Sequence, residues 1–312
     1  MSSPLGEPLP PPLKTCFGRD DLIEQIVHLT EDFKPVALIG AGGIGKTSIA
    51  LAVLHNDRVK KRFGDHRRFI HCDRFPASLL QFLSRLSKAV GAGIENPESL
   101  ISLHPFLSSA KMVIFIDNAE SILDPQGPDA SAICSAVEEL SRFENICLGI
   151  TSRISTVPPR FKRPTISALS MESACDMFYD IHDGGRSDVV QDLVKELDFH
   201  ALSITLLATT TSHNMWDYDR LTREWKTQRT QVLRTDYNES LAATIELSLS
   251  SPSFRNLGPL ARDLLGVIAF FPQGIDENNL DWLFPAIPNR TAIFDKFCVL
   301  SVTSRGGDSS RC

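Results

Sequence analysis

Residues 40–48 have the composition of a phosphate-binding loop. The spacing of Gly40, Gly45, Lys46 and Thr47 fits a loop whose backbone N–H groups surround the β- and γ-phosphates of a nucleotide. The Lys46 ammonium would add a point charge, and the Thr47 hydroxyl would bind Mg²⁺. A helix that begins at the end of the loop would direct its first N–H groups towards the anion. The predicted nucleotide-binding residues of this loop are Gly40, Ala41, Gly42, Gly43, Ile44, Gly45, Lys46, Thr47 and Ser48.

The segments on either side of the loop support this interpretation over an accidental glycine-rich turn. Four fixed positions would match by chance in roughly one chain in a hundred of this length. The run "VALI" before Gly40 is typical of a buried strand, and "TSIALAVLH" after the loop has helical character. A strand, a loop and a helix in this order form the setting that the motif requires.

A second candidate group is a carboxylate at the end of the apolar run "MVIFID". Asp117 would lie at the edge of a sheet, where it could bind Mg²⁺ opposite Thr47; the alternative is a plain turn residue. Many related sites place a second acid directly after this aspartate, but here Asn118 follows and the next acid is Glu120. Since an amide cannot act as a base, we expect slow hydrolysis.

A third candidate is Arg153, which follows the apolar run "LGITS". An arginine at the tip of a strand could reach the γ-phosphate and report its presence, because its planar fork suits phosphate oxygens. The alternative is an ordinary exposed arginine. Lys46, Asp117 and Arg153 form the predicted catalytic set, with Thr47 and Asp117 as the metal ligands.

The pattern of apolar runs indicates the elements that position these groups. Short apolar runs alternate with helical stripes, which predicts an α/β fold: a parallel five-stranded sheet with helices on both faces and a ligand at the carboxyl ends of the strands. The predicted strands cover residues 36–40, 68–72, 112–117, 146–151 and 165–168, and the clearest stripes between them contain Leu79, Phe82, Leu83, Leu86 and Val90, and Ile133, Ala136, Val137 and Leu140.

The chain divides by composition into four segments. A proline-rich linker covers residues 1–15, and the P-loop nucleotide-binding domain covers 16–168. After residue 168 the strand signals stop, and helical patterns predict a helical subdomain over 169–250. A further segment over 251–312 begins with two more helical stripes.

The overall composition excludes several classes of protein. With 312 residues and 42% hydrophobic content, the chain can bury a large core in more than one domain. A formal net charge of -6 argues against a general nucleic-acid or membrane-surface binder. The seven cysteines are scattered and include no C-x-x-C pair, which is typical of a reducing compartment. No transmembrane run or signal peptide is visible, so we expect a soluble, cytoplasmic protein.

The motifs in their order resemble the STAND class of signalling P-loop NTPases, and within it the NB-ARC type found in fungal NOD-like receptors. "FGRDDLIEQIVHL" resembles the motif that opens the family's nucleotide-binding module, which implies that Phe17 and Arg19 lie near the adenine. "DNAESILDPQG" and "NICLGITSRISTVPP" resemble fungal members. "FFPQGIDENNLDWLFP" resembles the start of a winged-helix subdomain, which implies an incomplete winged helix over 251–312.

Two family motifs differ here. The Gly-Leu-Pro-Leu-Ala motif, whose proline packs on the adenine, corresponds to "FHALSI" with Ala201 in the proline's place, and a Met-His-Asp motif has no counterpart. The resemblance implies ATP/ADP and Mg²⁺ as cofactors, and a switch in which exchange of ADP for ATP opens the module and permits homo-oligomerisation. It does not identify the effector or sensor parts.

Two other classes remain open as alternatives. One is a kinase-like P-loop enzyme that uses ATP as a substrate, although residues 169–312 contain no evident arginine-rich lid. The other is a winged-helix regulator that binds nucleic acid, although six basic and six acidic side chains from Arg255 onward leave no basic footprint.

Overall fold

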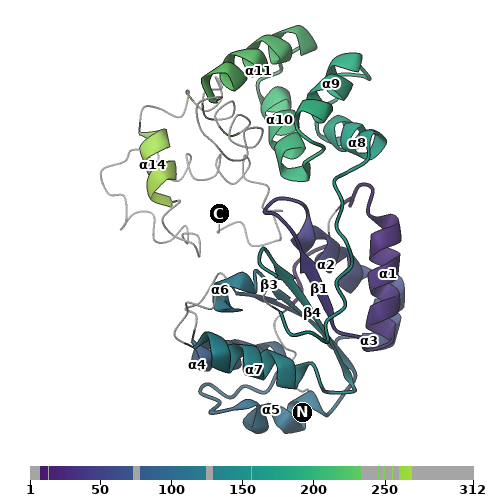
Figure 1. Cartoon of the computed structure of the whole chain (residues 1–312), viewed down its shortest axis with the longest axis vertical. Helices are drawn as coiled ribbons and strands as arrows, with labels where there is room; N and C mark the ends of the chain where they lie inside the picture. The colour runs from purple at the N-terminus through teal and green to yellow at the C-terminus, as the bar shows by residue number, and fades with distance from the viewer. Residues whose placement is uncertain are drawn as a thin grey trace. The chain divides into compact units, whose positions relative to one another are not determined.

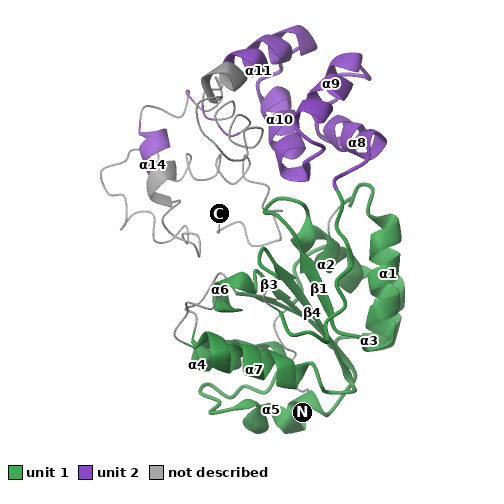
Figure 2. Cartoon of the chain, in the orientation of Figure 1, with its two compact units in different colours: residues 1–167 green, residues 168–312 purple. Residues whose placement is uncertain are grey.

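The computed structural model describes residues 8–12, 14–72, 78–123, 129–155, 157–232 and 260–268, together with single positions 245, 249 and 255. The chain forms two compact units, residues 1–167 and 168–312 (Figure 2). The elements of the first unit are α1 (Asp20–Glu31), β1 (Val36–Ile39), α2 (Lys46–His55), α3 (Asp57–Phe63), β2 (Arg67–His71), α4 (Leu79–Ala89), α5 (Leu100–Leu107), β3 (Met112–Asp117), α6 (Glu120–Leu123), α7 (Ala130–Leu140) and β4 (Ile146–Ser152).

The first unit is built around a parallel sheet in the order β1-β4-β3-β2. Every residue of β3 and β4 is buried, as expected for continuous apolar strands of a parallel sheet covered on both faces. Ile114, Ile116 and Leu148 pack on the face covered by α4, α5 and α7. Val113 and Phe115 pack on the face covered by α1, α2 and α3. Figure 1 shows these two groups of helices on opposite sides of the sheet. The predicted α/β architecture is confirmed.

The number of strands differs from the prediction. The described part of the sheet has four strands, and residues 165–168 form none. Among the described residues after β4, Lys162 alone pairs with the edge of β1. Its N–H donates to Pro35 O and its carbonyl accepts from the Ala37 N–H, both at 2.8 Å. Pro164 follows two residues later and has no N–H to extend a ladder. The predicted fifth strand is therefore wrong.

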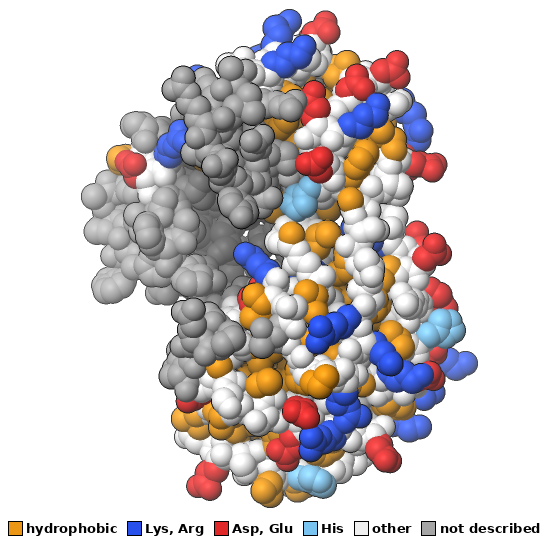
Figure 3. Space-filling view, in the orientation of Figure 1, with side chains coloured by type: hydrophobic (Ala, Val, Ile, Leu, Met, Phe, Trp, Pro, Cys, Tyr) orange, Lys and Arg blue, Asp and Glu red, His pale blue; other side chains and the backbone are white. Residues whose placement is uncertain are grey.

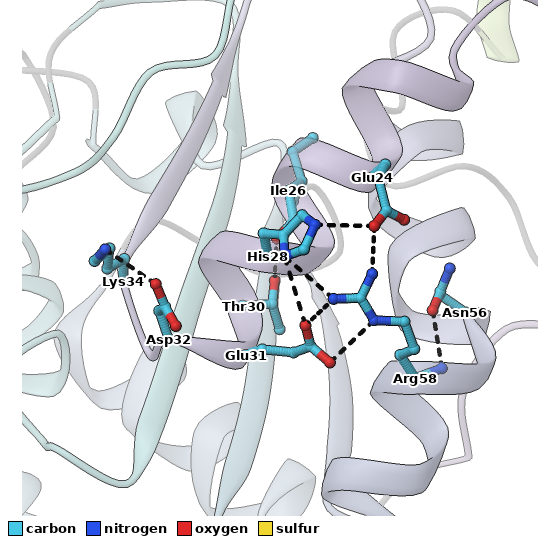
Figure 4. A network of polar contacts seen from close by, with 9 residues as sticks. All are labelled: Glu24, Ile26, His28, Thr30, Glu31, Asp32, Lys34, Asn56 and Arg58. Carbon is cyan, nitrogen blue, oxygen red and sulfur yellow. Dashed lines mark hydrogen bonds and ion pairs between the residues drawn. The ribbon is translucent and has the colours of Figure 1, made fainter.

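An arginine links two of the helices that cover one face of the sheet. Arg58, near the start of α3, donates to the carboxylates of Glu24 and Glu31 on α1, and its guanidinium lies 3.2 Å from His28 Nδ1 (Figure 4). The Asn56 side chain caps α3 by accepting from the Arg58 N–H at 2.9 Å. These contacts fix α1 against α3.

Part of the predicted proline-rich linker packs on the first unit. Leu9 lies against the core beneath α1 and α2, and the Pro10 carbonyl oxygen lies 2.7 Å from His55 Nε2 at the end of α2. Leu9 and Pro10 therefore contact the nucleotide-binding domain that the sequence assigns to residues 16–168.

The second unit is helical where the structure describes it. Phe178, Leu193, Leu207 and Trp225 are among the buried residues of its core. Its elements are α8 (Met171–Ile181), α9 (Asp188–Glu196), α10 (Ala201–His213), α11 (Tyr218–Val232) and α14 (Ala261–Ile268).

The helix α14 lies near the start of residues 251–312, where the sequence predicts a helix. The rest of the predicted winged-helix subdomain, including 270–285, lies outside the described residues, so this assignment stays a prediction. Among the helices that the structure describes, none combines the length and apolar character needed to cross a bilayer.

Candidate nucleotide-binding site

The carboxyl ends of the four described strands bring the candidate residues together. The loop that contains Gly40 follows β1, Arg153 follows β4, Asp117 ends β3 and His71 ends β2. Because β4 lies between β1 and β3, the end of β4 lies between the ends of the strands that precede the glycine-rich loop and contain Asp117. Ligands of open α/β sheets bind at such an edge.

The glycine-rich loop has the backbone that its sequence predicts. Gly43 and Gly45 have φ angles of 77° and 102°, in the left-handed region that favours glycine. Gly45 precedes the first residue of α2, Lys46, whose Nζ donates to the carbonyls of Gly40 and Ala41 at 2.8 and 2.9 Å. The lysine is thus held along the loop.

The surroundings of Lys46 lower the pKa of its ammonium. Burial is the main cause, since only 7% of the residue is exposed. The positive charge of Arg153 acts in the same direction, while the negative charges of Glu120 and Asp117 oppose the shift. An anion bound near Lys46 would favour the charged form of the lysine and so oppose this shift.

Asp117 is the most buried acid of the site. It accepts hydrogen bonds from the hydroxyls of Thr47 at 2.9 Å and Thr151 at 2.6 Å, and His71 Nδ1 lies 3.3 Å from its second oxygen. Burial alone would raise the pKa of this carboxyl, but the hydrogen bonds from His71, Thr151 and Thr47 outweigh it and hold the pKa below its usual value. Asp117 is therefore ionised at neutral pH although only 1% of the residue is exposed.

Thr47 and Asp117 fit a magnesium site. Their side chains are in direct contact and offer the oxygen donors that Mg²⁺ prefers. Within the described ranges, no group of three His, Cys, Asp or Glu side chains could hold a metal ion. A sparse protein donor set suits Mg²⁺, which typically uses one or two carboxylates together with substrate phosphates.

Arg153 lies beside the glycine-rich loop. A Cβ atom added to Gly42 would lie 3.4 Å from the Arg153 guanidinium carbon. The Nε atom of Arg153 is paired with Glu120 Oε1 at 3.2 Å, and its backbone N–H donates to Glu120 Oε2 at 3.1 Å. The structure thus brings Arg153 next to the loop, as the sequence predicts, and adds Glu120 as its partner.

Arg19 reaches the loop from the start of the domain. Its guanidinium donates to the carbonyls of Ile44 at 3.3 Å and Ser167 at 2.8 Å, and only 5% of the residue is exposed. Burial lowers the pKa of Arg19. Arg19 therefore contacts the loop itself, whereas the position of Phe17 and Arg19 relative to an adenine stays a prediction. Phe17 is partly buried.

Two partners of Asp117 were not singled out by the sequence patterns. His71 ends the run "RFIH", and Thr151 precedes Arg153 by two residues. The signal that could have found them is strand register, because Asp117 pairs with His71 on one side and Ile116 pairs with Ile150 on the other. Polar residues near the carboxyl ends of neighbouring parallel strands lie at the same edge of the sheet.

The comparisons with known proteins agree with this geometry. A family model described as Novel STAND NTPase 1 matches residues 13–168, which is half of the chain. Among solved structures, a Signal Transduction ATPase with Numerous Domains (STAND) protein with a tetratricopeptide repeat sensor from Pyrococcus horikoshii aligns with a TM-score of 0.60 at 16% identity, covering 93% of this chain. The chain spans 40% of that protein's length. A Walker-type ATPase of Pyrococcus abyssi aligns with a TM-score of 0.50 at 13% identity, covering 98% of this chain and 96% of that one.

These two structural likenesses show the fold. None of the curated proteins compared with the chain matches it. The family match includes the glycine-rich loop, Asp117 and Arg153, and it confirms the STAND class predicted from the motifs. The chain belongs to the Novel STAND NTPase 1 family.

Proposed function

We propose that the chain is an ATP/ADP-binding switch of the NB-ARC type, in which nucleotide exchange and slow hydrolysis control opening and homo-oligomerisation. The observation that carries the proposal is the position of Arg153, whose guanidinium lies against Gly42 of the phosphate loop. A nucleotide shifts a conformational equilibrium only by its differential affinity for the two states. An arginine beside the loop can supply that difference by contacting a group present in ATP and absent from ADP.

Different residues of the site would bind different parts of the nucleotide and its metal ion. The backbone N–H groups of the loop and the Lys46 ammonium would hold the phosphates, and Thr47 and Asp117 would hold Mg²⁺. When bound, Mg²⁺ neutralises charge between the β- and γ-phosphates. The carbonyls of Gly40 and Ala41 already fix Lys46 along the loop, which reduces the entropy that it loses on binding.

The residues after Asp117 support slow hydrolysis. Asn118 has no carboxylate, and its N–H is bonded to the Thr151 hydroxyl at 3.0 Å. The nearest following acid, Glu120, uses both carboxylate oxygens to hold Arg153. Because an amide is not a general base, Asn118 cannot activate the attacking water, and this supports slow hydrolysis.

The surface charge argues against the nucleic-acid-binding alternative, and the cysteines support a reducing compartment. On the face drawn in Figure 3, Lys and Arg side chains are interspersed with Asp and Glu side chains, which offers no basic footprint for nucleic acid there. The free thiols among the described cysteines suit the reducing cytoplasm: Cys16, Cys72, Cys134, Cys147 and Cys175.

The retained nucleotide tests the function directly. We expect mass spectrometry of the purified protein to find bound ADP, as in a switch that exchanges nucleotide slowly. Lys46→Ala should reduce ADP and ATP binding below detection by calorimetry. Lys60→Ala is the matched control, because Lys60 is an exposed lysine of the same unit that pairs with Asp57. Equal affinity in the wild type and Lys46→Ala would overturn the nucleotide site.

The kinase-like alternative predicts a different result. An enzyme that uses ATP as a substrate would be purified with an empty site and would turn over ATP at about 1–100 s⁻¹ with an acceptor. Such a rate in the isolated chain would favour the kinase-like enzyme and contradict the proposed switch.

A further inference from the structure

Glu120 contacts Arg153 at two points. One carboxylate oxygen pairs with the side-chain Nε at 3.2 Å, and the other accepts from the backbone N–H at 3.1 Å. Glu120 is the first residue of α6, three residues after Asp117, and its side chain is 18% exposed. The Glu120 carboxylate therefore holds both the backbone of Arg153, directly after β4, and the direction of its side chain.

This ion pair lies beside the phosphate loop. Arg153 lies against Gly42, while 64% of its side chain remains exposed to solvent. Glu120 is also close enough to Lys46 for its charge to act on the lysine. Breaking the ion pair between the Arg153 side chain and Glu120 would therefore require little movement of the protein, because the guanidinium is not buried.

We propose that Glu120 is a positioning residue that holds Arg153 in the absence of a γ-phosphate, and that the γ-phosphate of a nucleoside triphosphate competes with Glu120 for this arginine. The inference rests on the proposed function and deepens it. Carboxylate and phosphate oxygens are alternative partners for the same guanidinium fork. A diphosphate lacks the competing group, so it leaves the Glu120–Arg153 pair intact.

The competition biases the site towards ADP. A triphosphate gains Arg153 only after the pair with Glu120 is broken, whereas a diphosphate binds without this cost. Glu120 therefore lowers the affinity for ATP relative to ADP by the stability of the pair. Because the pair is partly exposed, we expect a factor of about five in the affinity ratio.

Glu120→Gln is the informative variant. The glutamine carbonyl can still accept from the Arg153 N–H, so the backbone contact is kept while the charge is removed. Affinities for ADP and for a β,γ-imido analogue of ATP should be measured by calorimetry on the full chain. We expect the ratio of triphosphate to diphosphate affinity to rise about fivefold in this variant.

A double-mutant cycle separates competition from direct repulsion. Arg153→Gln alone should lower the same ratio, and Glu120→Gln should have no further effect in that background. Glu138→Gln is the matched control, because it removes a carboxylate from another Glu–Arg pair of the same unit: Glu138 of α7 pairs with Arg142, just beyond the end of this helix, at 2.7 Å. It should leave the ratio unchanged.

Three results would overturn the proposal. An unchanged ratio in Glu120→Gln would show that the pair does not compete with the nucleotide. A rise that persists in the Arg153→Gln background would assign the effect to repulsion between Glu120 and the phosphates. Binding of neither nucleotide to the wild type would remove the proposed function and this inference with it.

Discussion

Thr151→Val tests whether the buried hydroxyl of Thr151 maintains the ionised Asp117. Thr151 is fully buried, and its hydroxyl donates to Asp117 Oδ1 at 2.6 Å and accepts from the Asn118 N–H at 3.0 Å. Asn118 has a φ angle of 54°, so the turn after β3 adopts a backbone that non-glycine residues rarely adopt. One hydroxyl therefore supports both the carboxylate and this turn.

The expected cost follows from these two hydrogen bonds. A hydrogen bond to a charged group contributes about 1.5–3 kcal/mol, and a buried N–H left without a partner costs about 1–3 kcal/mol. Valine has nearly the shape of threonine, so little of the loss comes from a cavity. Because Asn118 lies in a turn that can relax towards water, we expect the free energy of unfolding to fall by about 3 kcal/mol, near the lower end of the sum.

Unfolding of the chain in guanidinium chloride measures this loss of free energy, and hydrogen exchange of the β3 and β4 amides locates it in the first unit. Thr30→Val is the matched control, because Thr30 is equally buried but donates to the uncharged Ile26 carbonyl at 2.7 Å. It should cost about 1 kcal/mol. If Thr151→Val costs no more than Thr30→Val, the hydroxyl does not stabilise the Asp117 charge, and the reasoning fails.

Three further changes test other parts of the site and sheet. Asp117→Ala should weaken Mg²⁺-dependent ATP binding more than Mg²⁺-free ADP binding in calorimetry; equal losses would refute its role in holding the metal. Arg19→Met removes two hydrogen bonds to backbone carbonyls, so the loop amides should exchange hydrogen faster and ADP should bind about tenfold more weakly; unchanged exchange would show that Arg19 does not hold the loop. Gly149→Ala should cost about 1–3 kcal/mol, because its Cβ would overlap the Phe115 ring. Phe115→Leu in the same chain should make the combined loss smaller than the sum of the two single losses, and strict additivity would contradict the steric explanation.

The sequence predicted the features that depend on local pattern. The glycine spacing predicted the loop because only glycine adopts φ angles such as those of Gly43 and Gly45 without strain. The apolar runs predicted β3 with the correct limits and β1, β2 and β4 to within one residue at each end. Asp117 and Arg153 could be proposed as site residues because Asp117 ends a buried strand and Arg153 follows one.

The features that the sequence did not predict depend on pairing between distant segments. The run near residue 166 looks like a strand, but Pro164 prevents it from continuing the ladder that Lys162 starts beside β1. His71 resembles any other strand residue until its register with Asp117 is known. The pairing of Glu120 with Arg153 likewise needs the contact between β3 and β4, because 33 positions separate the two residues.

Strand order explains how one edge of the sheet brings together the glycine-rich loop, Asp117 and Arg153. Along the chain, β1 is followed by β2, yet in space β4 lies next to β1 and β2 lies at the far edge. This order puts Thr151 of β4 beside Asp117, and Arg153, directly after β4, beside Gly42. The end of β4 and the residue after it therefore contact both Asp117 and the phosphate loop. The Gly40 N–H also donates to the Ser152 carbonyl at 3.2 Å, which joins the loop to the end of β4. Arg153 therefore contacts the phosphate loop directly and lies two residues after Thr151, which contacts Asp117. Packed contacts of this kind are the physical requirement for a residue that would couple nucleotide state to the conformation of the domain.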